Sequence, residues 1–326
     1  MSTKARQLFT SLELLSQFFN CLLLLLQECR VHVHGYHTSA PLTLFQPLTS
    51  TVLSTMTCLL PATHEFRYPA YRIMHRCAGE HAPENTLAAI KFGYNRYKNK
   101  AIEFDVQLSR DNVPVLIHDV ELSRTTSGSG IVKNISHNTL SGLDAGSWYH
   151  ESFTTERIPL FTEVVEYCKA KSIWMNIELK GSEEEMAMHD DKRMYHIGET
   201  VATLTASLFQ EEMNQEDVDF KKLPLFSSFS IAALIAAKMA APLIPRALLV
   251  WRKADVPNLI EVLRHLDCCA VHLCDVDIEE YDLAAIKEAG LKILVYTVNS
   301  SARAVELHAL GIDAVCSDRF DVTINN

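Results

Sequence analysis

The chain has 326 residues, of which 48% are hydrophobic and 21% charged, and its formal net charge at pH 7 is −10. This composition is ordinary for one large globular domain or two small ones, and the negative charge argues against nucleic acid or an anionic membrane as the main partner. Nine cysteines without a Cys-x-x-Cys pair argue against a disulfide framework or a zinc site and favour a reducing compartment.

Residues 1–68 differ in pattern from the rest of the chain. Within 4–26, two basic residues precede a leucine-rich run at 8–26, which is the arrangement of a signal peptide or a membrane anchor. Polar residues such as Glu13 interrupt the run, however, and no small-residue cleavage site follows it. We therefore interpret 1–68 as a weakly structured or partly helical extension outside the fold. The expected location is the cytoplasm, and export or membrane anchoring through 4–26 is the alternative.

Strand-like and helical patterns alternate from Tyr71 onward. Apolar runs predict strands at 71–76, 101–106, 173–179, 224–229, 246–251, 269–274, 292–298 and 313–317. Apolar residues at helical spacing predict helices at 85–97, 161–171, 190–213, 230–240, 257–267, 278–289 and 301–310. Eight strands with intervening helices predict an α/β fold, a parallel (β/α)₈ TIM barrel, as one domain over 69–326.

One pair of runs departs from this alternation. Turn-forming residues, Ser109–Asn112, connect the second strand to Pro114–Asp119, so we expect a hairpin whose return arm lies above that strand. The stretch that follows, about 120–158, is then a small insertion. Insertions at the C-terminal face of a barrel usually cover the active site.

Glu103 and Asp105 lie two residues apart on a predicted buried strand. Because side chains alternate across a strand, the two carboxylates point the same way. Two ionised carboxylates on one face of an apolar strand need a partner, and a divalent hard cation is the natural one. The hairpin returns His118 to a place roughly opposite Asp105, and His75 ends the preceding strand. A metal, a general base and a general acid are together what a hydrolytic site needs.

Four short motifs lie between Met74 and Asp119. They are His75-Arg76, Pro83-Glu84-Asn85-Thr86, Glu103-Phe104-Asp105-Val106 and His118-Asp119. Together they resemble the signature of the glycerophosphodiester phosphodiesterase family, most closely its cytoplasmic bacterial branch. Residues 144–149, 176–180, 227–229 and 295–299 also fit, so the resemblance extends from about Tyr71 to Val322.

The resemblance implies metal-dependent hydrolysis of glycerophosphodiesters to sn-glycerol 3-phosphate and an alcohol. It implies three metal ligands, Glu103, Asp105 and Glu178, with Mg²⁺ or Ca²⁺ as the ion and Mn²⁺ as a further candidate. Small-molecule glycerophosphodiesters are then the expected partners, nucleic acid is not, and a homodimer is a candidate assembly.

Further side chains receive roles from the same resemblance. The general acid/base pair is His75 and His118, because histidine suits both roles near neutral pH. The phosphate-binding cations are Arg76 and Lys180. Tyr296 is expected to line the glycerol pocket. The supporting residues are Glu84 and Asn85.

Simpler interpretations compete with several of these roles. Glu178 and Lys180 lie two residues apart on one strand face and suit an ion pair, and Arg76 suits a salt bridge to Glu84. Tyr296 is equally well explained as an ordinary barrel aromatic. These pairings and the proposed roles are compatible, because a carboxylate that holds an arginine can also orient it.

One position departs from the family pattern. Family members usually carry glycine after His-Arg, whereas this chain has Cys77. Glycine there permits close backbone approach or an unusual dihedral. A cysteine beside the site also raises the hypothesis that thiol reagents inhibit the enzyme.

Two rival functions remain open at this point. One is a lysophospholipase D-like or sphingomyelinase D-like phosphodiesterase on the same barrel, for which an apolar loop surface at the barrel mouth is expected. The other is a non-catalytic barrel that binds glycerophosphoryl groups, for which loss of a histidine or carboxylate is expected. The insertion is polar apart from Trp148, Tyr149 and Phe153, and every expected catalytic side chain is present. Both facts favour the glycerophosphodiesterase.

Overall fold

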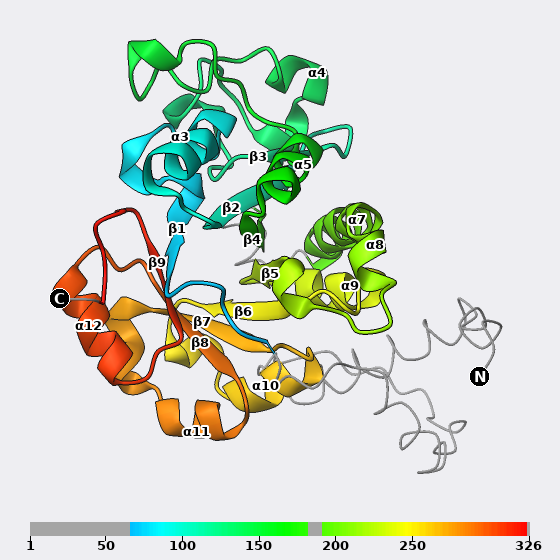
Figure 1. Cartoon of the computed structure of the whole chain (residues 1–326). Coiled ribbons are helices and arrows are strands. Elements are labelled where there is room, and N and C mark those ends of the chain that lie inside the picture. Colours follow the sequence, from blue (N-terminus) through cyan, green and yellow to red (C-terminus); the bar gives the residue numbers. More distant parts are fainter. Residues whose placement is uncertain (1–65, 182–190, 325–326) are drawn as a thin grey trace, which may run out of the picture. The chain divides into compact units, whose positions relative to one another are not determined.

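The computed structural model describes residues 66–181 and 191–324 (Figure 1). Within these ranges, eight parallel strands form a closed barrel, because β1 and β2 pair with each other and complete the circle. The strands are β1 (Arg72–Met74), β2 (Ala101–Leu108), β4 (Trp174–Leu179), β5 (Leu225–Ser228), β6 (Arg246–Val250), β7 (Ala270–Cys274), β8 (Lys292–Tyr296) and β9 (Ala314–Ser317). The barrel predicted from the alternating pattern is confirmed.

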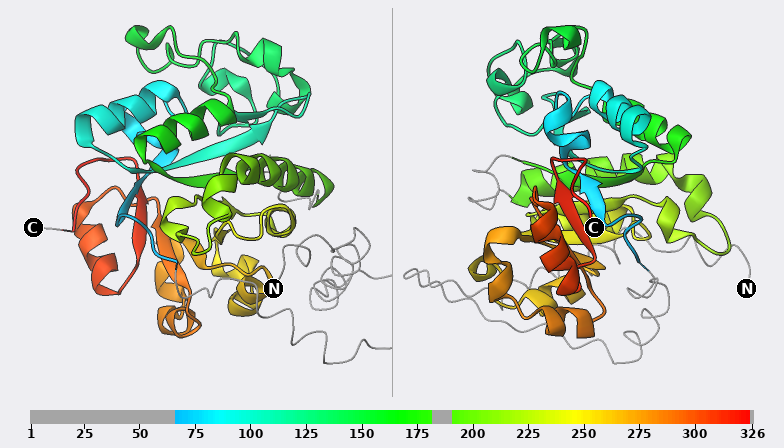
Figure 2. Two further views of the ribbon diagram at one scale, coloured as in Figure 1. Left: turned by 45° about the vertical axis from the view of Figure 1, so that its right-hand side comes forward. Right: turned by 60° about the vertical axis from the view of Figure 1, so that its left-hand side comes forward.

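Helices follow the strands along the chain and lie around the outside of the barrel (Figure 2). They are α3 (Leu87–Tyr97), α5 (Phe161–Lys171), α7 (Asp191–Leu208), α8 (Gln210–Met213), α9 (Ile231–Ala240), α10 (Leu259–His265), α11 (Leu283–Glu288) and α12 (Ser301–Ala309). The largest difference from prediction is at 278–289, where a 3₁₀ turn, Asp275–Glu280, precedes a short α11. Asp282 separates them, because its side chain accepts a hydrogen bond from the N–H of Ala285 and begins a new helix.

The alternation along β2 directs its carboxylates into the barrel. All eight residues of β2 are buried. Ile102, Phe104 and Val106 belong to the apolar cluster that packs β2 against the helices. Because successive side chains point to opposite faces, Glu103 and Asp105 point toward the barrel interior. The predicted common orientation of these two residues is therefore observed.

The predicted hairpin is also present. β3 (Pro114–Leu116) pairs antiparallel with β2, and the turn between them includes Asn112 at a φ of 59°. The N–H of Ile117 donates to the carbonyl of Asp105 at 3.1 Å. Ile117 is therefore the residue opposite Asp105, and His118 follows one position later.

The insertion after the hairpin has a small apolar core of its own and one short helix, α4 (His137–Leu140). The buried residues of this core are Val115, Ile117, Leu122, Val132, Leu140, Ala145 and Ile158. Val115 and Ile117 come from the hairpin itself, so the insertion packs directly onto the segment that precedes His118.

Packing around the barrel reaches back to Phe66, which is buried together with barrel residues. The Tyr68 hydroxyl lies 3.0 Å from Nε2 of His272 on β7. The rest of the predicted extension, including the leucine-rich run at 8–26, lies outside the described residues. Among the helices that the structure does describe, none has both the length and the apolar character needed to cross a membrane.

Candidate active site

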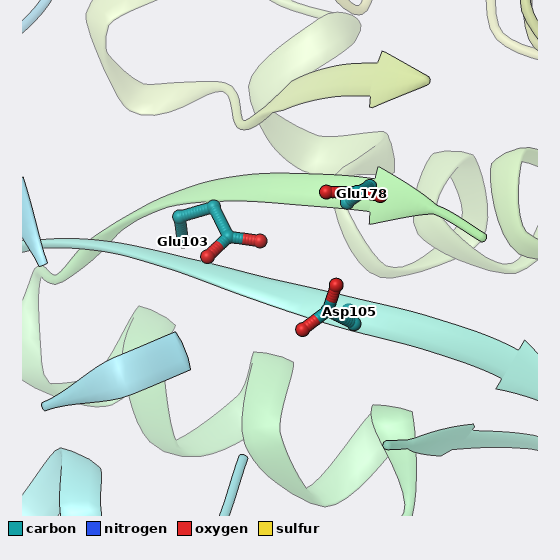
Figure 3. A group of neighbouring side chains, drawn as sticks. All are labelled: Glu103, Asp105 and Glu178. Atoms are coloured by element: carbon teal, nitrogen blue, oxygen red, sulfur yellow. The ribbon is translucent and has the colours of Figure 1, made fainter. Parts of the chain in front are cut away.

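Three carboxylates converge where β2 and β4 approach the C-terminal end of the barrel (Figure 3). Each of Glu103, Asp105 and Glu178 offers an oxygen, and these oxygens lie within 4.8 Å of one another. The strand register explains the meeting, because Asp105 and Glu178 are direct partners across the parallel pair. All three residues are buried.

The surroundings of Glu103 and Asp105 shift the pKa values of these two carboxylates in opposite directions. Burial raises the pKa of Glu103 to about 8, together with repulsion from Asp105 and Glu178. Burial opposes ionisation of Asp105 too, but the charges of Lys180, His118 and Arg76 and the hydrogen bond from Asn85 together outweigh it, so the pKa of Asp105 is lowered. Simultaneous ionisation of all three carboxylates is therefore disfavoured without a further positive charge beside Glu103.

Unpartnered polar atoms lie beside this trio. Among the described residues, Oε1 of Glu103, Oδ1 of Asn176 and Oγ of Ser227 are buried without a hydrogen-bond partner. Asn176 is the β4 partner of Glu103, and Ser227 is the β5 partner of Glu178. Buried polar oxygens without partners are costly, and oxygen ligands are what a hard divalent cation prefers. The residues present therefore fit a divalent cation.

Two positively charged side chains, Lys180 and Arg76, flank the carboxylates. Nζ of Lys180 lies 3.0 Å from Oε1 of Glu178 and 3.5 Å from Oδ1 of Asp105. Arg76 donates from Nη1 to Glu84 at 3.0 Å, and its backbone N–H donates to Oε2 of Glu103 at 2.9 Å. Both pairings that simpler interpretations predict are therefore present. They also hold the two cations beside the carboxylate trio.

Asn85 supports Asp105 from the loop before α3. Its Nδ2 donates to Oδ2 of Asp105 at 2.8 Å, and its Oδ1 accepts from the backbone N–H of Asp105 at 3.2 Å. Asn85 has a φ of 54°, a left-handed conformation that asparagine tolerates better than most residues. The Asn85 side chain thus holds both the carboxylate and the backbone of Asp105.

Each of the two predicted histidines is held by a carboxylate. Nδ1 of His75 lies 2.7 Å from Oδ1 of Asp318, and Nδ1 of His118 lies 2.7 Å from Oδ1 of Asp119. Burial opposes protonation of His75, but the bond to Asp318 and the charge of Glu103 outweigh it, so its pKa is raised. With Nδ1 engaged in each ring, Nε2 is the nitrogen left to exchange a proton with a substrate.

Four side chains that support this arrangement are absent from the predicted site. Asp119 and Asn299 lie inside motifs of the sequence, and Asp318 follows a predicted strand. Asn299 donates to Oδ2 of Asp318 at 2.8 Å, which holds the carboxylate that holds His75. Arg124 contacts Asp119 and Glu84. Residue type and strand ends could have nominated the first three, whereas their pairing required the fold.

The hydroxyl of Tyr296 makes its hydrogen bond to a backbone carbonyl and not to a charged group of the site. Its hydroxyl donates to the carbonyl of Val250 at 2.9 Å, and its ring meets that of Phe229 edge-on at 6.2 Å. Burial raises the pKa of the Tyr296 hydroxyl. The hydroxyl donor is therefore used within the barrel.

Cys77 is fully buried and has a φ of 79°, a region that favours glycine. Burial also raises the pKa of its thiol, and a buried, protonated thiol is inert. The structure therefore does not support sensitivity to thiol reagents through this residue. We expect native protein to retain its activity under iodoacetamide, with mass spectrometry detecting Cys77 alkylation only after denaturation. Alkylation of Cys77 in the native enzyme would contradict this expectation.

Comparison with known proteins agrees with this geometry. The model of the glycerophosphoryl diester phosphodiesterase family matches residues 75–322. A putative glycerophosphodiester phosphodiesterase of Bacillus subtilis, YhdW, is 30% identical over 258 residues, which cover 78% of this chain and 97% of the relative. A glycerophosphodiester phosphodiesterase of Caldanaerobacter subterraneus is 28% identical, covering 78% of this chain and 96% of the relative. The structure of an Oleispira antarctica phosphodiesterase in complex with the product sn-glycerol-3-phosphate aligns at a TM-score of 0.65 and 33% identity, covering 78% of this chain and 95% of that one.

Proposed function

The chain belongs to the glycerophosphoryl diester phosphodiesterase family, and we propose which of its residues carry out the reaction and on which substrates. The enzyme hydrolyses glycerophosphodiesters to sn-glycerol 3-phosphate and an alcohol. We propose water-soluble diesters such as glycerophosphocholine and glycerophosphoethanolamine as substrates. The observation that carries the proposal is the convergence of three buried carboxylates with two cations and two carboxylate-held histidines.

Glu103, Asp105 and Glu178 would hold the divalent cation, for which Mg²⁺ and Ca²⁺ are the first candidates and Mn²⁺ the third. When bound, such a cation polarises a phosphoryl oxygen and stabilises the negative charge that develops on it. Arg76 and Lys180 bind the remaining phosphate oxygens. Their positive charges are fixed before the substrate arrives, so they need no reorganisation as charge grows in the transition state.

His75 and His118 divide the proton transfers. Nε2 of one histidine accepts the proton of the attacking oxygen, and Nε2 of the other donates a proton to the departing alkoxide. The attacking oxygen is either the neighbouring glycerol hydroxyl, which forms a cyclic phosphate that water then opens, or water itself. Asp119 and Asp318 keep each ring oriented through its Nδ1, and the hydrogen bond to Asp318 favours the protonated form of His75. Tyr296 contributes its ring as one wall of the glycerol pocket.

An acyl-chain diester is the second candidate substrate. Exposed aromatic side chains lie on loops at the same end of the barrel, namely Trp148, Tyr149 and Trp251. Such residues favour contact with an apolar chain. The non-catalytic alternative is not retained, because the family is one of enzymes and the residues proposed for catalysis are all present.

A comparison of two substrates tests the proposal. We expect rapid release of sn-glycerol 3-phosphate from glycerophosphocholine. Release of choline from lysophosphatidylcholine should be at least about 100-fold slower, because the groups proposed to bind substrate are mostly charged or polar. The reverse order of rates would favour the second candidate. Other expectations from the sequence stay predictions: a cytoplasmic location, a homodimer, and independence of nucleic acid and membrane.

A further inference from the structure

Arg124 holds two carboxylates at once. It ends a 3₁₀ turn, Leu122–Arg124, in the insertion. Its guanidinium donates to both oxygens of Glu84 at 2.8 Å, and Nη2 also donates to Oδ1 of Asp119 at 2.9 Å while Nε donates to Oδ2. A planar guanidinium can serve two carboxylates in this way, whereas the single ammonium of lysine cannot.

Each of these carboxylates holds an active-site side chain on its other side. Oε1 of Glu84 accepts from Nη1 of Arg76 at 3.0 Å, and Oδ1 of Asp119 lies 2.7 Å from Nδ1 of His118. The contacts form one continuous chain of alternating charge, from Arg76 through Arg124 to His118. Hydrogen bonds to Arg124 and His118 outweigh burial and lower the pKa of Asp119 to about 2, so this carboxylate stays ionised.

Burial and hydrogen bonds within the insertion hold the turn that carries Arg124. Leu122 is fully buried in the core of the insertion. Its N–H donates to the carbonyl of Gly130 at 3.0 Å, and its own carbonyl accepts from Oγ1 of Thr126 at 2.7 Å. The backbone that carries Arg124 is therefore well held, although 43% of the Arg124 side chain is exposed.

We propose that Arg124 is a positioning residue that couples the orientation of Arg76 to that of His118 through Glu84 and Asp119. The inference rests on the proposed roles of Arg76 in phosphate binding and of His118 in proton transfer. It gives the insertion a role in the site besides the expected one of covering it. The competing interpretation is an exposed ion pair without effect on the reaction, as many surface ion pairs are.

A mutant cycle distinguishes these interpretations. The full chain with Mg²⁺ is assayed on glycerophosphocholine as wild type, Glu84→Gln, Asp119→Asn and the double variant, each with Arg124 present or replaced by alanine. With Arg124 present, each single change lowers kcat/KM, and the double variant loses at least about 10-fold less than the product of the two losses, because coupled residues are not additive. With Arg124→Ala, the two losses multiply.

A matched arginine provides the control. Arg303 also contacts two carboxylates, Asp275 at 2.9 Å and Glu306 at 3.0 Å, but neither of them holds a side chain of the site. Arg303→Ala should leave kcat/KM within about 2-fold of wild type. Arg124→Lys should lose activity nearly as Arg124→Ala does, because one ammonium cannot make paired contacts to both carboxylates. It replaces the alanine variant in the cycle if that variant fails to fold.

Two results would overturn the proposal. One is multiplicative losses while Arg124 is present, and the other is an Arg124→Ala variant that keeps kcat/KM within about 2-fold of wild type. The activity of the wild type distinguishes failure of this inference from failure of the proposed function. A folded wild type that releases no sn-glycerol 3-phosphate would refute the proposed function, and this inference with it.

Discussion

Replacing His118 with glutamine should lower kcat for glycerophosphocholine by about 10²- to 10⁴-fold, which is the usual contribution of a positioned general acid or base. Glutamine can keep a polar contact with Asp119 but cannot accept and return a proton. KM should change much less, because Arg76 and Lys180 still bind the phosphate. Steady-state kinetics at saturating substrate and metal measure both quantities.

The chain offers a control for this loss. His265 on α10 is exposed, and its Nδ1 lies 2.8 Å from the carbonyl of Glu261 in its own helix. His265→Gln should keep the wild-type kcat, since this histidine has no carboxylate partner and no place in the site. A His118→Gln variant that folds and retains kcat within about 10-fold would remove His118 from proton transfer.

Replacing Glu103 with glutamine should lower kcat/KM by about 10²- to 10³-fold, because a well-held cation supplies several kcal/mol of charge stabilisation. The glutamine side chain would keep an acceptor for the N–H of Arg76, but the trio would lose one negative charge. A ligand that binds only the native state raises the melting temperature. Mg²⁺ should therefore raise that of the wild type but not that of Glu103→Gln.

The same change should stabilise the metal-free protein. Glu103 has its pKa raised from 4.5 to about 8 in the folded state. An acid with a raised native pKa destabilises the fold increasingly as pH rises from about 4.5 to about 8, because the unfolded state ionises first. Metal-free Glu103→Gln should therefore melt higher than metal-free wild type at pH 8, and the two should converge near pH 5. A variant that melts lower than wild type at pH 8 would contradict this account of the trio.

Local pattern was sufficient to predict the barrel and the common orientation of Glu103 and Asp105. Period-two alternation placed Glu103 and Asp105 on one strand face, and the turn after Leu108 predicted the hairpin. These predictions depend on neighbours in sequence, for which chain geometry is decisive. The break at Asp282 was missed because apolar spacing continues across it, although the aspartate that caps the N–H three residues later is a local signal.

The supporting network could not be read in the same way. His75 and Asp318 are 243 positions apart, and the pairing of β1 with β9 brings them together. Arg124 in the insertion and Glu84 in the loop before α3 are 40 positions apart, and the fold brings them together. Such contacts carry no local signal, since arginine and aspartate are common on any surface.

The most direct test of the account is release of sn-glycerol 3-phosphate from glycerophosphocholine by wild type and His118→Ala, with and without EDTA. The account predicts release by wild type that EDTA abolishes and that Mg²⁺, Mn²⁺ or Ca²⁺ restores, and at most a trace of release by His118→Ala under any of these conditions. Undiminished release in EDTA, after exhaustive removal of metal, would contradict the role of the carboxylate trio. Release by a folded His118→Ala at the wild-type rate would contradict the proton transfer proposed here.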